Sequence, residues 1–269
     1  MFLSCGDRNW RDDILEAILK ILCIWANICL SPKAGYQLGK KDSVITHLLD
    51  IVGAYVEHDK GTDADLILHS ILVVVGNISY YIASDSELCI EVSKCVTPLL
   101  DDSYSFEIRL ESANIIRNLT RSPKTRAYIQ EHSLLPAFIQ LLREDGKDFN
   151  TAAYGIIMNL LIDRTSCELF YKEEGVTRLL HKLHLCADRD WKTCAFLCQI
   201  LWNYCGGENA DTIPIKKIEA QHLLKYLTYS LRENSGSTNR NTDQVWSNEF
   251  CPVAQKLLEL LKTKKCCIS

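Results

Sequence analysis

The sequence lacks the motifs by which most enzyme classes are recognised. It has no glycine-rich phosphate-binding loop, no nucleophile elbow, no paired metal-binding carboxylates and no set of protein-kinase motifs. It also lacks an excess of positive charge, since 30 Lys and Arg residues stand against 34 Asp and Glu residues. The net charge of −4 argues against nucleic acid as a generic partner. We therefore predict a protein that is not an enzyme and needs no cofactor.

An apolar secretion signal is also missing, because charged residues follow the first six positions. The apolar stretch at residues 14–30 contains Glu16 and Lys20 and is too short to span a bilayer comfortably. The chain has 13 cysteines, many of them in apolar stretches, where a free cysteine packs as a small hydrophobic residue. We therefore expect an intracellular, cytoplasmic protein with reduced thiols.

A metal site is not predicted either. His181, His184, Cys186, Cys194 and Cys198 lie near one another in the sequence, but their spacing matches no known zinc pattern. Cysteine is among the residues most often buried in protein cores. We interpret these cysteines as part of an apolar helix face.

What the sequence does contain is a short apolar segment with an asparagine, repeated five times. The asparagines are Asn27, Asn77, Asn118, Asn159 and Asn203, at spacings of 50, 41, 41 and 44 residues. An amphipathic stretch follows each asparagine by about 16 to 18 residues and keeps the same phase. A fixed period in the forties is typical of a helical solenoid, in which each unit buries its apolar face on the next.

Two segments resemble armadillo repeats. Residues 112–120 are similar to the end of that family's third helix, which carries a motif like L-x-N-L, and residues 175–180 to the opening of its second helix. The resemblance covers roughly residues 10–261. It implies an all-α fold, an armadillo-type right-handed superhelix of about five to six repeats with incomplete first and last units.

The expected domain organisation follows from this pattern. We expect one solenoid over residues 1–261, beginning with a lone third helix at residues 10–30 and ending with a long helix at residues 245–261. A polar, mobile loop is predicted at residues 233–243. Residues 262–269 form a basic C-terminal tail.

The resemblance also implies a binding face. In peptide-binding members of the family, the corresponding asparagines line the concave groove and bond the backbone of an extended ligand, since an amide offers both donor and acceptor. The groove residues predicted on this interpretation are Asn77, Asn118, Asn159, Asn203, Arg117, Arg121 and Trp202. The other interpretation is that the asparagines bond neighbouring backbone within the superhelix.

Two observations limit the kinds of peptide segment that are expected to bind. Nuclear-import receptors of the family carry a tryptophan four residues before the asparagine, and none of the five copies here does, so nuclear-localisation peptides are not expected to bind. Arg117 and Arg121 suit an acidic or phosphorylated segment through bidentate bonds. The alternative is a solvated helix face on which they pair with Glu107 and Glu111.

The C-terminus carries a separate signal. Its last four residues, from Cys266 to Ser269, match a prenylation box, and three lysines precede them within residues 262–265. Cys266 is the predicted lipidation site, and membrane association is expected only if it is prenylated. Three functions thus stay open: a non-catalytic scaffold for an extended partner segment, a prenylated membrane-tethered adaptor or trafficking factor, and a ciliary or flagellar assembly factor.

Overall fold

The chain folds into α-helices and short helical turns. The computed structural model describes residues 10–58, 61–143, 146–186, 189–206, 215–233 and 244–263, and no strand occurs in these ranges. The chain divides into two compact units, Met1–Tyr128 and Ile129–Ser269. Both units contain helices that carry the motif asparagine near their ends and are separated by other helices and turns; we call each of these a third helix. The single array expected over residues 1–261 stays a prediction.

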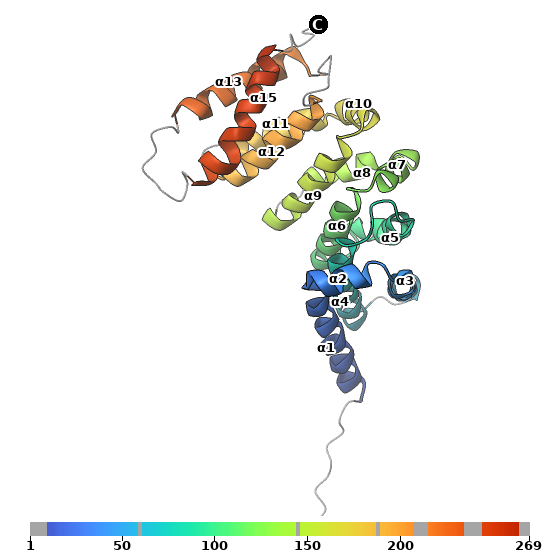
Figure 1. Ribbon diagram of the computed structural model, residues 1–269. Coiled ribbons are helices and arrows are strands. Elements are labelled where there is room, and N and C mark those ends of the chain that lie inside the picture. The colour runs from blue at the N-terminus through green and yellow to red at the C-terminus, as the bar shows by residue number, and fades with distance from the viewer. Residues whose placement is uncertain are drawn as a thin grey trace, which may run out of the picture. The chain divides into compact units, whose positions relative to one another are not determined.

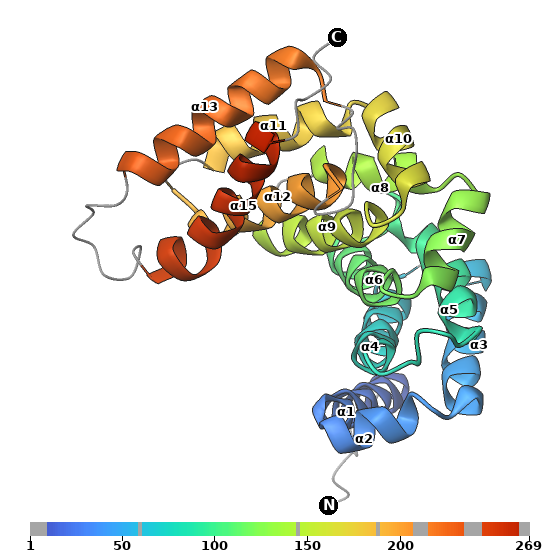
Figure 2. The same ribbon diagram turned by 45° about the horizontal axis from the view of Figure 1, so that its top comes forward.

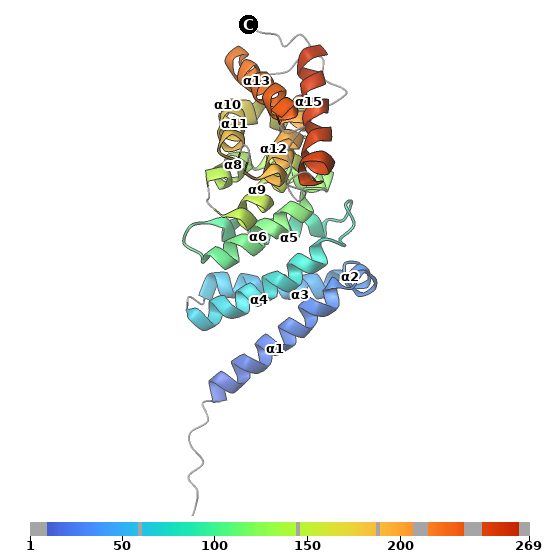
Figure 3. The same ribbon diagram turned by 90° about the vertical axis from the view of Figure 1, so that its left-hand side faces the viewer.

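Three third helices build the first unit. They are α1 (Trp10–Leu30), α4 (Thr62–Ser79) and α6 (Phe106–Leu119), and α4 packs between the other two (Figures 1 and 3). The helix predicted at residues 10–30 is present as α1. The helix α4 is long and apolar enough to cross a membrane, judged by length and composition alone. The same holds for α1 and α2 taken as one segment, although the chain bends by 107° between them. In the folded unit α4 is a core helix covered on two sides.

Shorter elements connect these three helices. Between α1 and α4 lie α2 (Pro32–Leu38) and α3 (Asp42–His58), and between α4 and α6 lie α5 (Leu88–Val96) and the 3₁₀ turn η1 (Thr97–Leu100). Pro32 opens α2, where its missing N–H group leaves no helical bond unmade. Ser105 caps α6, since its hydroxyl accepts the N–H of Ile108.

The second unit repeats the same order after α7 (Pro123–Glu131). Its elements are α8 (Leu135–Gln140), η2 (Leu141–Arg143), α9 (Lys147–Leu160), α10 (Arg164–Lys172), α11 (Gly175–Cys186), α12 (Trp191–Tyr204), α13 (Lys217–Glu233), η4 (Trp246–Phe250) and α15 (Cys251–Thr263). The third helix α12 packs against α9 and α15 (Figure 2). Aromatic pairs fill this core: Phe170 against Tyr204 and Trp191 against Phe250, with ring centroids 5.9 and 4.8 Å apart.

Six of the ten described cysteines are buried. Cys194 and Cys198 are fully buried on α12, as their apolar setting predicts, and Cys167 is buried on α10. Burial disfavours the thiolate, and it raises the pKa of Cys167 to about 11 and the pKa of Cys198 further still. Cys23 on α1, in contrast, is exposed.

These environments predict unequal thiol reactivity. Because the thiolate is the reactive species, iodoacetamide at pH 8 is expected to alkylate Cys23 in the folded protein and to spare Cys167 and Cys198. Peptide mass mapping after a timed reaction measures this, and the same reaction in denaturant provides the control in which all three react. Labelling of Cys198 at the rate of Cys23 in the folded protein would contradict the buried assignment.

Candidate binding face of the third helices

Three motif asparagines bond the repeat that precedes their own. In each, the side-chain Nδ2 donates to a backbone carbonyl on the previous third helix. The pairs are Asn77 with Ala26 (3.0 Å), Asn118 with Gly76 (3.2 Å) and Asn203 with Met158 (3.2 Å). Every acceptor directly precedes the asparagine of the previous copy, so the same contact recurs; we call it the asparagine ladder. For the Nδ2 atoms of these three asparagines, the structure therefore agrees with the interpretation in which the side chains bond neighbouring backbone within the superhelix.

Asn27, the first copy, shows what happens where no earlier third helix is described. Its Nδ2 donates within its own helix, to the carbonyl of Cys23 at 2.9 Å. Asn159 holds the equivalent position in α9, next to the end of the helix, and is half-buried. The motif position is thus shared by all five asparagines, whereas the ladder bond requires a neighbouring helix.

The side-chain oxygen of two ladder amides accepts no hydrogen bond from the described residues. Asn118 uses Nδ2 twice, for the carbonyl of Gly76 and for Oγ of Ser79 at 3.0 Å. Among the described residues, no donor lies within hydrogen-bonding distance of Oδ1 of Asn118 or Asn77. Oδ1 of Asn203 accepts instead from Nε2 of Gln199 at 3.1 Å. The ladder therefore fixes the orientation of these amides and, in the first unit, leaves an acceptor for another molecule.

Arg121 is held by the backbone of two repeats. Its Nε donates to the carbonyl of Asn118 at 2.9 Å and its Nη2 to the carbonyl of Tyr80 at 2.8 Å. The guanidinium also lies over the Tyr80 ring, 4.5 Å from the centroid. Arg121 is thus exposed, but its guanidinium is hydrogen-bonded to backbone. These bonds link the end of α6 to Tyr80, the residue that follows α4.

Arg117 lies beside an acidic side chain. Burial lowers the pKa of the half-buried Arg117 guanidinium, and the nearby Glu111 opposes that effect. Burial also raises the pKa of Glu111, and His69, Asn114 and Arg117 each oppose this rise. This arrangement agrees with the alternative in which the arginine interacts electrostatically with Glu111.

The predicted site residues are distributed over both units. Asn77, Asn118, Arg117 and Arg121 belong to the first, and the two remaining asparagines belong to the second together with Trp202, which is half-buried beside Asn203 on α12. Cys266 lies outside the described residues, as do positions 234–243 of the predicted loop and positions 264–269 of the predicted tail. The helix α15 extends to Thr263, two residues into that tail.

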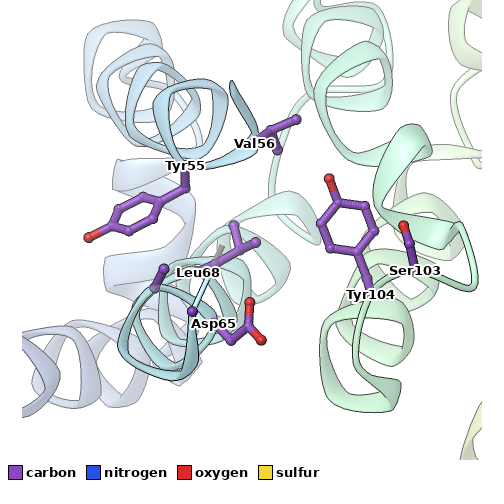
Figure 4. A pocket seen from close by; sticks show the side chains of 8 residues that line it. Tyr55, Val56, Asp65, Leu68, Ser103 and Tyr104 are labelled. Carbon is purple, nitrogen blue, oxygen red and sulfur yellow. The ribbon is translucent and has the colours of Figure 1, made fainter. Parts of the chain in front are cut away.

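Each unit has a hollow among its described helices. A cavity of about 120 Å³ in the first unit is lined by Val56 and Asp65 on one side and Tyr104 on the other (Figure 4). This volume is below the roughly 300–1,000 Å³ of typical small-molecule sites. A larger groove, of about 690 Å³, lies between α11 and α13 in the second unit, lined by His181, Tyr229 and neighbouring residues. In the described part of the chain, no group of three His, Cys, Asp or Glu residues is placed to hold a metal ion.

Comparison with solved structures decides the fold. An engineered protein superposes with a TM-score of 0.66 at 15% identity, over 97% of this chain and 94% of its own. A designed armadillo repeat protein superposes with a TM-score of 0.65 at 17% identity, over 95% of this chain and 96% of its own. The chain has the armadillo-repeat fold. The predicted resemblance and the predicted fold class, an all-α armadillo-type superhelix, are thereby confirmed.

Sequence comparison points to the same repeats. No family model matches the chain. Armadillo repeat-containing protein 2 of Mus musculus is 24% identical over 271 residues, which cover 97% of this chain and 31% of the mouse protein. The Homo sapiens protein of the same name is 23% identical over 257 residues, 92% of this chain and 29% of the human one. The armadillo chain described here therefore spans about a third of the length of these relatives.

Proposed function

We propose that this armadillo chain is a non-catalytic scaffold that binds an extended segment of a partner protein along the asparagine-bearing face of its third helices. The observation that supports this most directly is the ladder. Asn77 and Asn118 are each held by a backbone carbonyl through Nδ2 and present an oriented Oδ1 without a protein donor in the described ranges. A side-chain amide held in this way is suited to accept a peptide N–H.

The spacing of the third helices fits an extended ligand. Packed helices lie about 8–10 Å apart, and an extended chain advances roughly 3.3 Å per residue. Neighbouring asparagines would therefore meet peptide groups about two to three residues apart. A designed armadillo repeat protein with the same fold (TM-score 0.58, 17% identity, covering 89% of this chain and 99% of its own) was solved in complex with the peptide (KR)4, so the fold itself is compatible with linear ligands.

We further propose that the partner segment is acidic or phosphorylated. An acidic or phosphorylated segment would bind Arg117 in the neighbourhood of Glu111, and it would bind Arg121 after that side chain exchanges its two carbonyl contacts. The basic (KR)4 ligand of the designed relative shows that the fold does not set this charge. Acidic, phosphorylated and basic versions of one binding peptide distinguish these cases.

A double-mutant cycle tests the proposed contact. A linear peptide selected from a random library on the full chain is N-methylated at each amide in turn. Methylation of the amide that meets Asn118 is expected to weaken binding about tenfold in the wild type, the effect of one hydrogen bond, and less than about twofold in Asn118→Ala. Isothermal titration calorimetry measures all four affinities.

The matched control is Asn114→Ala, an identical change on the same helix outside the ladder. This variant is expected to keep the tenfold effect of methylation. Each variant is first shown to be folded by its thermal transition, which separates binding from stability. The absence of any selectable linear peptide, or equal effects of methylation in wild type and in every ladder variant, would refute the proposal.

Membrane attachment through Cys266 stays a prediction from the sequence, since the residue is outside the described ranges. The cytoplasmic localisation and the ciliary or flagellar role likewise stay predictions. No contact in the described helices favours either over the scaffold function.

A further inference from the structure

The first helix carries an uncovered apolar stripe. Its members are Ile14, Ile18, Ile21, Ile24, Trp25 and Ile28, which are between 37% and 57% exposed. Spacings of three and four residues place them on one helix face. The adjoining face packs on α4, and Figure 3 shows α1 with α4 on only one side. We call these six residues the α1 stripe.

The composition of the stripe is that of an interior surface. Aligning Asn27 with Asn77 gives an offset of 50 residues and superimposes the sequence of α1 on that of α4. The α4 residues that correspond to the last five members of the stripe are at most 3% exposed: Leu68, Ile71, Val74, Val75 and Ile78. Positions that are fully covered in the next repeat are thus open in α1. A contiguous apolar patch of this kind marks an interaction site.

We propose that the α1 stripe binds the same stripe of a second copy, forming a two-fold symmetric dimer with antiparallel α1 helices. A head-to-tail contact with the last helical segment, residues 244–263, is disfavoured, because none of the large exposed apolar residues of the described chain lies there. The stripe of a second copy offers the apolar partner that this segment does not. Identical patches that meet about a two-fold axis form a closed interface.

Charge favours the antiparallel arrangement. The first turn of α1 carries Asp12 and Asp13, and the exposed Lys33 follows the other end of the helix. Antiparallel pairing brings the acidic end of one helix near Lys33 of the second copy. The same acidic residues, with Glu16 paired to Lys20, make an anionic membrane surface an unfavourable occupant.

Side-chain sizes suggest a register centred on Ile21. Antiparallel helices centred there place Ile21 opposite Ile21 of the second copy and Ile14 opposite Ile28. The small Ala17 then faces the large Trp25, so the two surfaces can interdigitate. This register makes a specific prediction for cross-linking.

Light scattering after size-exclusion chromatography of the full chain tests the dimer. The expected mass is 61.2 kDa, twice the 30.6 kDa of one chain, at protein concentrations well above a micromolar dissociation constant. Ile21→Glu is expected to halve the mass without loss of helicity, since the side chain is already 56% exposed. The matched control Ile162→Glu changes an isoleucine that is 61% exposed outside α1 and is expected to leave the dimer intact.

Cysteine cross-linking tests the register independently of mass. Oxidised Ile21→Cys protein is expected to form a disulfide between the substituted positions of the two copies, identified by peptide mass mapping. Ile14→Cys is expected to cross-link only when mixed with Ile28→Cys. A mass of 30.6 kDa at about 100 μM protein, far above micromolar affinity, would overturn the proposal. So would a monomer that floats with phosphatidylserine-containing vesicles, which would assign the stripe to a membrane.

Discussion

Replacing Phe170 by alanine is expected to lower the free energy of unfolding by about 3–5 kcal/mol, the range for truncating a buried aromatic ring. Phe170 is fully buried on α10, and its ring packs on Tyr204 of α12 at 5.9 Å. The ring also lies so close to Gly175, at the start of α11, that an added Cβ there would overlap ring atoms. Alanine would therefore leave a cavity where three helices meet, and the close backbone of α11 limits collapse into it.

The control is Phe106→Ala, which removes the same atoms from a ring that is 43% exposed at the start of α6. Its expected cost is below about 1 kcal/mol, as for other surface positions. Urea titrations followed by circular dichroism give both values. Since two units can unfold separately, hydrogen exchange of amides in α10 and α12 localises the loss. Equal costs for the two variants would show that the Phe170 site is not tightly packed.

The positions of the third helices could be predicted because they depend on local pattern. Asn118, Asn159 and Asn203 each stand one residue before the end of a third helix, and Asn77 stands two before. The period of apolar residues sets which face of a helix is buried, and burial on neighbouring repeats then fixes the fold. This is why the period was sufficient to predict a helical solenoid, whereas the armadillo fold was implied by the resemblance of residues 112–120 and 175–180 to that family.

The contacts of the site could not be predicted in the same way. The ladder joins residues 42 to 51 positions apart, and its bonds depend on the distance between helices to within a few tenths of an ångström. The sequence left both interpretations of the asparagines open for this reason. Similarly, nothing local to Arg121 indicates that it bonds the carbonyl of Tyr80, 41 residues earlier.

The last helical segment shows a comparable limit. A long helix was predicted over residues 245–261, and the structure has a π-helical turn, Trp246–Phe250, followed by α15 to Thr263. The turn places Phe250 against Trp191 of α12, a contact set by packing between helices. The 3.6-residue period of apolar residues that predicts an α-helix gives no sign of a π-helical turn, in which the hydrogen bonds span five residues.

Removing one ladder bond from each unit at once, through Asn118→Ala and Asn203→Ala, is expected to cost about 1.5–4.5 kcal/mol. Asn203→Ala removes the side-chain donor to the Met158 carbonyl, and an unmet buried polar group costs about 1–3 kcal/mol. Asn118→Ala removes one of two side-chain donors to the Gly76 carbonyl, which keeps the hydroxyl of Ser79 at 2.7 Å, so the expected cost there is that of one hydrogen bond, about 0.5–1.5 kcal/mol. The sites lie in different units and share no partner, so their effects are expected to add. Chemical denaturation of the two single variants and the double variant measures the sum.

Asn114→Ala again serves as the control, because Asn114 is half-buried on α6 and interacts with Glu111 of its own helix. Its expected cost is below about 1 kcal/mol, typical of a hydrogen bond within one helix. If Asn118→Ala is no less stable than Asn114→Ala, the Ser79 hydroxyl alone satisfies the Gly76 carbonyl, and this ladder bond contributes nothing to stability. A large loss for Asn118→Ala alone would instead show that Oγ of Ser79, its second acceptor, matters as much as the repeated carbonyl contact. Helicity at room temperature is expected to persist in every variant, because the apolar faces that hold the third helices together are unchanged.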